Sequence, residues 1–195
     1  MGRDVSGIRQ IRARHPPFWR AVIADARLTA TYRFERSTFR SRVDALVQAA
    51  RLIWASDAFG AQVLYRLKAR LQALRIPILP RVAHRLAMAT AQVSIGDPVI
   101  IEPGVYLAHG QVVIDGVVEI EAGTVIFPWV TVGLIAGELR GPTIHRYVQI
   151  GTGAKVLGPV IVGEGARIGA NAVVVDDVPA KATVAGVPAR VVSEG

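Results

Sequence analysis

Residues 148–175 read VQIGTGAKVLGPVIVGEGARIGANAVVV, and an aliphatic residue returns at every sixth position of this stretch. The rule extends back to residue 95 and covers thirteen units, which open with Ile95, Ile101, Leu107, Ile114, Ile120, Ile126, Val132, Ile144, Ile150, Val156, Val162, Ile168 and Val174. A helix repeats every 3.6 residues and a strand every two, so a period of six requires short extended runs that are each broken by a turn.

Hexapeptide repeats of this kind build a parallel β-helix, in which three units form one triangular coil of about 18 residues. Successive coils then stack at roughly the 4.8 Å spacing of neighbouring strands. One unit cannot bury its apolar face alone, so the stack supplies the core. The sequence therefore predicts a mainly β fold rather than a β-sandwich, whose strands would recur every 8 to 12 residues or so.

The rhythm breaks in two places, and functional residues often lie where loops leave a rigid scaffold. Between Leu107 and Ile114 there are seven residues instead of six, and the extra residue falls beside His109 and Gly110. Farther on, Glu138 occupies a position where an aliphatic residue is expected. We therefore predict a loop over residues 134–142.

The repeat divides the chain into an α-helical domain, residues 1–92, and a β-helix domain, residues 93–195. Four helices are predicted in the first domain, at 17–33, 38–55, 57–74 and 80–90. Two apolar stripes at helical spacing each require a partner surface, and the domain is expected to pack against the first coil and neighbouring subunits. The stripes comprise Val43, Leu46, Val47, Ala50 and Ile53, and Val63, Leu67, Leu71 and Leu74.

Charge is divided between the two domains. Residues 1–92 hold 17 Lys and Arg against 5 Asp and Glu, a net +12, whereas residues 93–195 hold 6 against 10, a net −4. The basic domain could attract nucleic acid, anionic lipid or an acidic protein, or its arginines could simply line solvated helix faces. No helix-turn-helix turn or aromatic RNA-binding signature accompanies the charge, so no nucleic-acid partner is expected.

Composition excludes several kinds of site. The chain has no cysteine, which rules out disulfides and thiolate metal sites. Four histidines, at 15, 84, 109 and 145, include no pair at short ligand spacing, so no metal is expected. No apolar run reaches 18 residues, and no integral membrane segment is expected. The expected location is the cytoplasm.

Several motifs together resemble the serine acetyltransferase group of hexapeptide acyltransferases, over residues 59–192. They are ALRIPILPRVAHRL, LAHGQVVI, FPWVTVG, GPTI, VQIGTGAKVLGPVIVGEGARIGANAVV and AGVPARVV. The resemblance implies a left-handed parallel β-helix, a homotrimer with the active site between adjacent subunits, and acetyl-CoA as co-substrate. A dimer of trimers is a further possibility that the sequence leaves open.

In that family the residue matching His109 is the general base that takes the proton of the acceptor hydroxyl. The chemistry suits histidine, because an unperturbed imidazole titrates near 6.5 and is largely neutral at pH 7. The tetrahedral oxyanion formed by attack on the thioester requires fixed N–H donors, which a turned, glycine-rich backbone can present.

The chain departs from the family around this histidine. A carboxylate about fifteen residues upstream orients the family's histidine, but Ser94 stands there, and the nearby Asp97 falls in a turn position. The family's serine-binding residues correspond here to Ala108, Arg140 and Gly141. The acceptor is therefore left open between L-serine and a hydroxyl on a sugar, a polysaccharide or a specialised metabolite.

Further site residues follow from the resemblance and from the coil arithmetic. His145 lies 36 residues beyond His109, which is two regular coils, so it is expected on the same side about 10 Å away. Arg140 and His145 are candidate acceptor contacts, and Phe127 and Trp129 are expected to shape the acceptor site or to fill a subunit interface. The residues expected to bind coenzyme A, with Lys155 and Arg190 at its phosphates, are Gly133, Gly153, Ala154, Lys155, Gly186, Pro188 and Arg190.

Two functions remain in view. The first is an acetyl-CoA-dependent O-acetyltransferase with His109 as general base. The second is a noncatalytic trimeric scaffold that binds partners through its basic helices, which the missing carboxylate at Ser94 favours.

Overall fold

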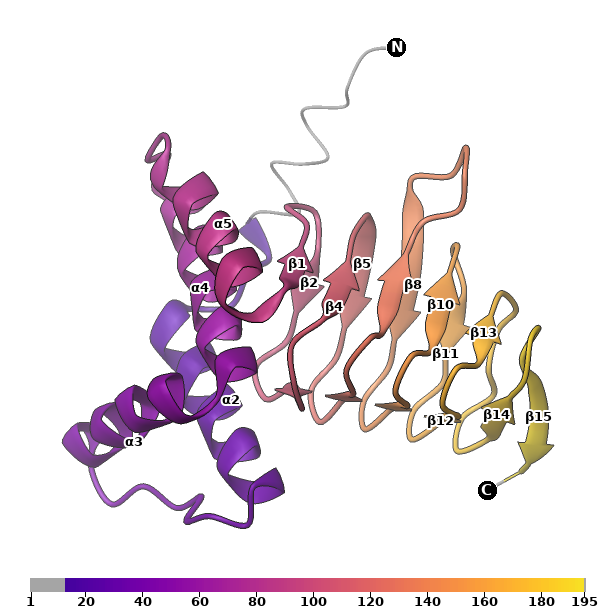
Figure 1. Ribbon diagram of the computed structural model, residues 1–195, viewed down its shortest axis with the longest axis horizontal. Helices are drawn as coiled ribbons and strands as arrows, with labels where there is room; N and C mark the ends of the chain where they lie inside the picture. The colour runs from indigo at the N-terminus through magenta and orange to yellow at the C-terminus, as the bar shows by residue number, and fades with distance from the viewer. Residues whose placement is uncertain (1–12, 195) are drawn as a thin grey trace.

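The computed structural model describes residues 13–194 as a helical domain at one end of a β-helix whose coils follow one another along the long axis (Figure 1). The helices are α2 (Phe18–Tyr32), α3 (Arg42–Ala55), α4 (Asp57–Ala73) and α5 (Leu79–Ala91). Ser41 and Ser56 precede α3 and α4, and their hydroxyls accept the backbone N–H of Asp44 and Phe59. These caps satisfy N–H groups that a helix start leaves without partners.

The strands form three sheets, one on each side of a triangular prism. Sheet A contains β1 (Val93–Ile95), β4 (Val112–Ile114), β7 (Thr131–Gly133), β10 (Lys155–Leu157) and β13 (Val173–Val174). Sheet B contains β2 (Ile100–Ile101), β5 (Val117–Ile120), β8 (Arg140–Ile144) and β11 (Ile161–Val162). Sheet C contains β3 (Tyr106–Leu107), β6 (Val125–Ile126), β9 (Gln149–Ile150), β12 (Arg167–Ile168), β14 (Thr183–Ala185) and β15 (Arg190–Ser193).

The chain passes from sheet A to B to C in every coil, which defines three edges: the A–B edge, the B–C edge and the C–A edge. All thirteen aliphatic residues of the repeat are buried in one core cluster. Their register is regular where the coils are regular, as in the parallel pairing of Val156 with Val174. The predicted fold class, a left-handed parallel β-helix preceded by a helical domain, is confirmed.

The excursion from the repeat is shorter than predicted. Residues 134–139 form the loop at the A–B edge, and residues 140–142 belong to β8 instead. Gly141 is buried there, and a Cβ on it would lie 2.5 Å from Val118 Cγ2. A register shift between Val117 and Glu119 of β5 accommodates the extra length, so the strand resumes earlier than the hexad count indicates.

The interface between the two domains is polar, because backbone carbonyl groups of the first coil face the helical domain and require hydrogen-bond donors. Within the β-helix, strand N–H groups donate to carbonyls of the following coil, as Gly96 N does to Ile114 O at 2.8 Å, whereas several turn N–H groups donate to the preceding coil, as Gly123 N does to Gly104 O at 2.6 Å. The first coil therefore turns its carbonyls toward the helical domain, where no preceding strand can donate to them. Four side chains of α4, namely Gln62, Tyr65, Arg66 and Lys68, donate to Val105 O, Val99 O, Ile101 O and Ile95 O, respectively.

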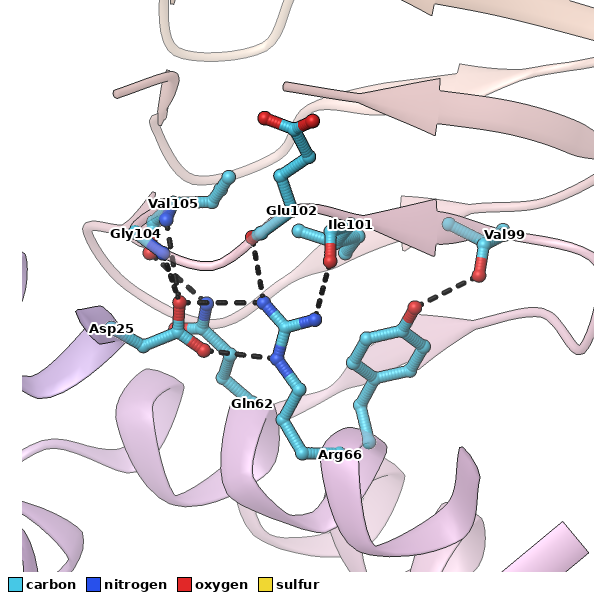
Figure 2. A network of polar contacts seen from close by, with 9 residues as sticks. Asp25, Gln62, Arg66, Val99, Ile101, Glu102, Gly104 and Val105 are labelled. Atoms are coloured by element: carbon cyan, nitrogen blue, oxygen red, sulfur yellow. Dashed lines mark hydrogen bonds and ion pairs between the residues drawn. The ribbon is translucent and has the colours of Figure 1, made fainter. Parts of the chain in front are cut away.

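Arg66 is held in this row by a buried carboxylate from α2 (Figure 2). Asp25 Oδ2 accepts from Arg66 Nε at 3.0 Å, and Asp25 Oδ1 accepts from Gly104 N at 2.8 Å. Both side chains are at most 2% exposed. Burial raises the pKa of Asp25, while the Arg66 guanidinium acts in the opposite direction. The pair connects α2, α4 and the first coil.

Because the first coil requires hydrogen-bond donors, the apolar stripes predicted on α3 and α4 do not form the interface between the domains. The face of α4 that is buried includes Gln62, Arg66 and Lys68, whereas Leu67 and Leu74 of the predicted stripe are exposed. The stripe on α3 is exposed as well; its apolar members include Val43, Leu46, Val47 and Ile53, at 70%, 45%, 58% and 45%. The domain therefore packs against the first coil as expected, but through the polar face of α4, and the α3 stripe is not part of that contact.

Tyr65 gives this interface a measurable dependence on pH. Burial raises the pKa of its phenol from 10 to about 12. Below pH 10 the phenol is protonated in both folded and unfolded chains; between pH 10 and 12 only the unfolded chain loses the proton, so stability falls. We expect about 2 to 3 kcal/mol to be lost across this window. Denaturant unfolding should show this loss in wild type but not in Tyr65→Phe; parallel curves for both would contradict the assignment.

None of the helices within residues 13–194 combines the length and apolarity needed to cross a membrane.

Candidate active site

His109 lies at the C–A edge of the first coil, in the turn between β3 and β4, and its side chain is exposed. The turn is fixed to the end of α5: Gln111 N donates to Ala91 O at 2.9 Å, and Gln111 adopts a φ of 57°. Gly110 packs so closely that a Cβ would lie 1.9 Å from the same carbonyl oxygen. The seventh residue of this unit thus forms a turn anchored on the helical domain, which presents His109 outward.

We expect Gly110→Ala to disturb His109, because the added methyl group must displace the backbone at Ala91. Turnover of the variant should fall by about tenfold or more, since small misplacements of reacting groups are costly. A matched control is Gly60→Ala in α4, where the nearest atom to the new Cβ lies 3.4 Å away. Steady-state kinetics of both variants test this; equal turnover in Gly110→Ala and wild type would contradict the role of the turn.

Two aromatic residues lie at the same edge as His109, one coil farther along. Leu107 pairs with Ile126, so the turn after β6, which carries Phe127 and Trp129, follows the turn that carries His109 along the stack. Phe127 and Trp129 are 38% and 58% exposed. The C–A edge therefore carries an exposed imidazole in one coil and two partly exposed aromatic rings in the next.

The proposed coenzyme residues divide into three places. Gly153, Ala154 and Lys155 lie at the C–A edge of the next coil, where Gly153 N donates to Pro128 O at 2.9 Å and Lys155 Nζ donates to Trp129 O at 2.6 Å. Gly186, Pro188 and Arg190 follow β14, beyond the last coil; Gly186 O accepts from Val173 N at 3.0 Å in sheet A. Gly133 ends β7 and lies toward the A–B edge, apart from the other residues.

Arg190 is available for a ligand. Its guanidinium is 3.1 Å from Asp176 Oδ2, but the two side chains are 66% and 70% exposed. An ion pair so open to water contributes little, so a phosphate could replace the carboxylate.

Arg140 is not near His109 within one chain. It begins β8, after the loop at the A–B edge, whereas His109 lies at the C–A edge. The two residues could meet only if the A–B edge of one copy faces the C–A edge of another.

The expected position of His145 is wrong. It follows β8 at the B–C edge, where its Nδ1 lies 3.1 Å from Glu121 Oε1. The register advances 19 residues from Leu107 to Ile126 but 24 from Ile126 to Ile150, because the loop lengthens that coil. Thirty-six residues therefore do not make two coils here, and the structure does not bring His145 to His109.

Neither of the two positions considered from sequence, Ser94 and Asp97, places a carboxylate next to His109. Ser94 pairs with Val113 in sheet A. Asp97 lies at the A–B edge, where its Oδ1 is 3.1 Å from Lys68 Nζ. Within residues 13–194 the imidazole of His109 has no recorded hydrogen-bond partner, so in this chain the turn at Gly110 and Gln111 fixes the backbone that carries it.

Metal-ligand geometry is not found in the described part of the chain: no three of its His, Asp and Glu side chains converge closely enough to hold an ion.

Sequence reasoning missed a basic cavity between α4 and α5, described below, and the buried pair of Asp25 and Arg66. The available signal was the concentration of Lys and Arg around the RIPILP segment. Charge alone, however, does not distinguish a solvated face from a cavity.

Comparison with known proteins adds several similarities. The family model described as bacterial transferase hexapeptide (six repeats) matches residues 141–176. A serine acetyltransferase of Helicobacter pylori is 36% identical over 138 residues, which cover 69% of this chain and 80% of that protein. A serine acetyltransferase of Synechococcus elongatus is 36% identical over 137 residues, and one of Mycobacterium tuberculosis is 40% identical over 121. The match covers 69% and 60% of this chain, respectively, but only 56% and 52% of those two proteins, so the chain spans little more than half of their length.

Solved structures extend the similarity to nearly the whole chain. A serine acetyltransferase from Vibrio cholerae has a TM-score of 0.76 at 30% identity, covering 97% of this chain and 71% of that one. A serine acetyltransferase in complex with CoA has a TM-score of 0.73 at 28% identity, covering 96% and 74%.

Proposed function

Because this chain belongs to the serine acetyltransferase family of hexapeptide acyltransferases, we propose that it transfers the acetyl group of acetyl-CoA to an acceptor hydroxyl, a reaction that we place in the cytoplasm. The observation that carries the proposal is the turn that presents His109 at the C–A edge, on the edge that also holds Phe127, Trp129 and Lys155.

In this proposal, neutral His109 accepts the hydroxyl proton while the hydroxyl oxygen attacks the thioester carbonyl. The C–O bond forms, the C–S bond breaks, and the departing thiolate takes the proton from the imidazolium. Histidine thereby returns to its neutral form, and no acetylated side chain is required. Lys155 and Arg190 supply the positive charge that the coenzyme phosphates need.

We propose that the chain acts as a homotrimer. Arg140 and His109 lie at different edges of one chain, so a site that contains both requires two copies. We place Arg140 of one copy opposite His109 of the next. The exposed α3 stripe supplies an apolar surface through which two trimers could join, since such stripes usually mark protein contacts.

The acceptor need not be L-serine. Besides Ser94 and Ala108, the buried Gly141 supports this, because the 2.5 Å approach to Val118 leaves no room for a side chain in β8. Gly141 therefore offers no side-chain contact to a substrate. We propose a hydroxyl on a sugar, polysaccharide or specialised metabolite as an acceptor class alongside L-serine.

Release of free thiol from acetyl-CoA tests the proposal, with L-serine and a panel of sugars compared at one coenzyme concentration. At least one acceptor should raise the rate of thiol release above the acceptor-free rate. If none of them does, although the chain is folded and binds acetyl-CoA, the hydroxyl-transfer proposal is wrong.

The second candidate is a noncatalytic trimeric scaffold. The observation that favours it is Ser94, which stands where the family has the carboxylate that orients its histidine. Calorimetry separates the two candidates: micromolar binding of acetyl-CoA supports the enzyme, and an absence of binding supports the scaffold.

A further inference from the structure

A cavity of about 650 Å³ lies where the end of α4 and the start of α5 meet the A–B edge of the first coil. Its basic lining consists of Lys68, Arg75, Arg81, His84 and Arg85. The α4–α5 connection, residues 76–78, completes the wall. The cavity is on a different edge from His109 and uses none of the residues proposed for acetyl transfer.

Within residues 13–194, the positive charge of the cavity is largely uncompensated. Asp97 is the carboxylate among the described lining residues, and it already lies 3.1 Å from Lys68 Nζ. Among residues 13–194, no carboxylate is recorded within 4 Å of the guanidinium groups of Arg75, Arg81 or Arg85. Three guanidinium groups thus border one cavity without an anionic partner in the described chain.

The backbone at the mouth of the cavity is strained. Ile78 has φ 68° and ψ −56°, and Leu79 N donates to Pro77 O at 2.7 Å, which together define the rare γ-turn with positive φ. A β-branched residue in this conformation is strained, and such strain gathers at ligand sites. The turn starts α5 with neither a side-chain cap nor an acidic residue in its first turn. The partial positive charge of the helix end therefore adds to that of the arginines.

His84 adds a neutral donor to the same wall. Burial lowers its pKa, and the charge of Lys68 lowers it further. A neutral imidazole can donate one N–H to an oxygen without adding to the repulsion among the cations.

We propose that this cavity binds the phosphate groups of a pyrophosphate-class ligand. Guanidinium groups match phosphate oxygens in pairs, and several of them together suit a multiply charged anion. A single carboxylate would leave most of the charge unpaired. The volume lies within the range of about 300 to 1,000 Å³ that is usual for small-molecule sites.

Calorimetric titration of the full chain with sodium pyrophosphate, at constant ionic strength, tests the proposal. Wild type should bind, and Arg81→Gln/Arg85→Gln should bind at least tenfold more weakly. The matched control is Arg40→Gln/Arg42→Gln, which removes two exposed charges of the same domain outside the cavity and should bind within twofold of wild type. Circular dichroism and thermal melting confirm that each variant is folded.

Two further measurements show where pyrophosphate binds and whether the natural phosphate belongs to a lipid or to a free ligand. Lys155→Gln/Arg190→Gln should keep its pyrophosphate affinity, which separates the cavity from the proposed coenzyme site. Co-sedimentation with phosphatidic-acid vesicles, lost in Arg81→Gln/Arg85→Gln, assigns the phosphate to a lipid headgroup; pyrophosphate binding without co-sedimentation assigns a free ligand. The proposal is overturned if wild type does not bind pyrophosphate at millimolar concentration, if both arginine pairs weaken binding equally, or if only the Lys155 and Arg190 variant does.

Discussion

His109→Ala should lower kcat for acetyl transfer by about 10² to 10⁴, the usual contribution of a general base. Binding of acetyl-CoA should change little, because the imidazole lies among the proposed acceptor groups rather than at the proposed phosphate contacts Lys155 and Arg190. Initial rates of thiol release and calorimetric coenzyme affinity measure the two effects separately.

The loss of activity should be specific to His109. The matched control is Gln149→Ala, which alters an exposed polar residue of sheet C and should retain wild-type rates. Equal kcat in His109→Ala and wild type would remove His109 from the mechanism.

Asp25→Ala should destabilise the fold by about 3 to 5 kcal/mol, because it leaves the Arg66 guanidinium buried without its counter-ion. The N–H of Gly104 loses its acceptor as well. Denaturant unfolding of wild type and variant measures the difference in free energy.

The double variant Asp25→Ala/Arg66→Met tests how much of the lost stability comes from the unpaired charge of Arg66. Removing both charges should recover part of the lost stability, since the uncompensated cation is the main cost. Asp176→Ala is the matched control, because its ion pair with Arg190 is exposed and should contribute little. If Asp25→Ala is as stable as Asp176→Ala, the buried pair does not hold the two domains together.

The core of the β-helix could be predicted from sequence because its repeat is local. Each unit places one aliphatic residue inward, so Ile95 or Val174 can be assigned to the core without knowing how the coils pair. The helix boundaries were also close, because the prolines of RIPILP separate α4 from α5.

The domain interface could not be predicted in the same way. An apolar stripe predicts burial only when the facing surface is apolar, and the end of a β-helix is a row of carbonyl oxygens. Polar residues such as Arg66 and Lys68, which would be placed in solvent by composition, are buried there as donors. The predicted stripe on α3 remains outside for the same reason.

The positions of the site residues could be predicted from sequence only where the coils have a regular length. His109 was found because its insertion disturbs the count, and the turn at Gly110 accounts for that extra residue. His145 was misplaced because the edge that a residue occupies depends on the length of every coil before it. The position of Arg140 relative to His109 could not be predicted either, because the two residues lie at different edges of one chain and could meet only between copies.

Mass spectrometry of the acceptor, after incubation with acetyl-CoA that carries a deuterated acetyl group, tests the central claim most directly. We predict that wild type forms a labelled acetyl ester on a hydroxyl of at least one acceptor, and that His109→Ala forms it at least a hundredfold more slowly. Label found solely as free acetate, or the same labelled ester formed equally fast by both proteins, would contradict the account.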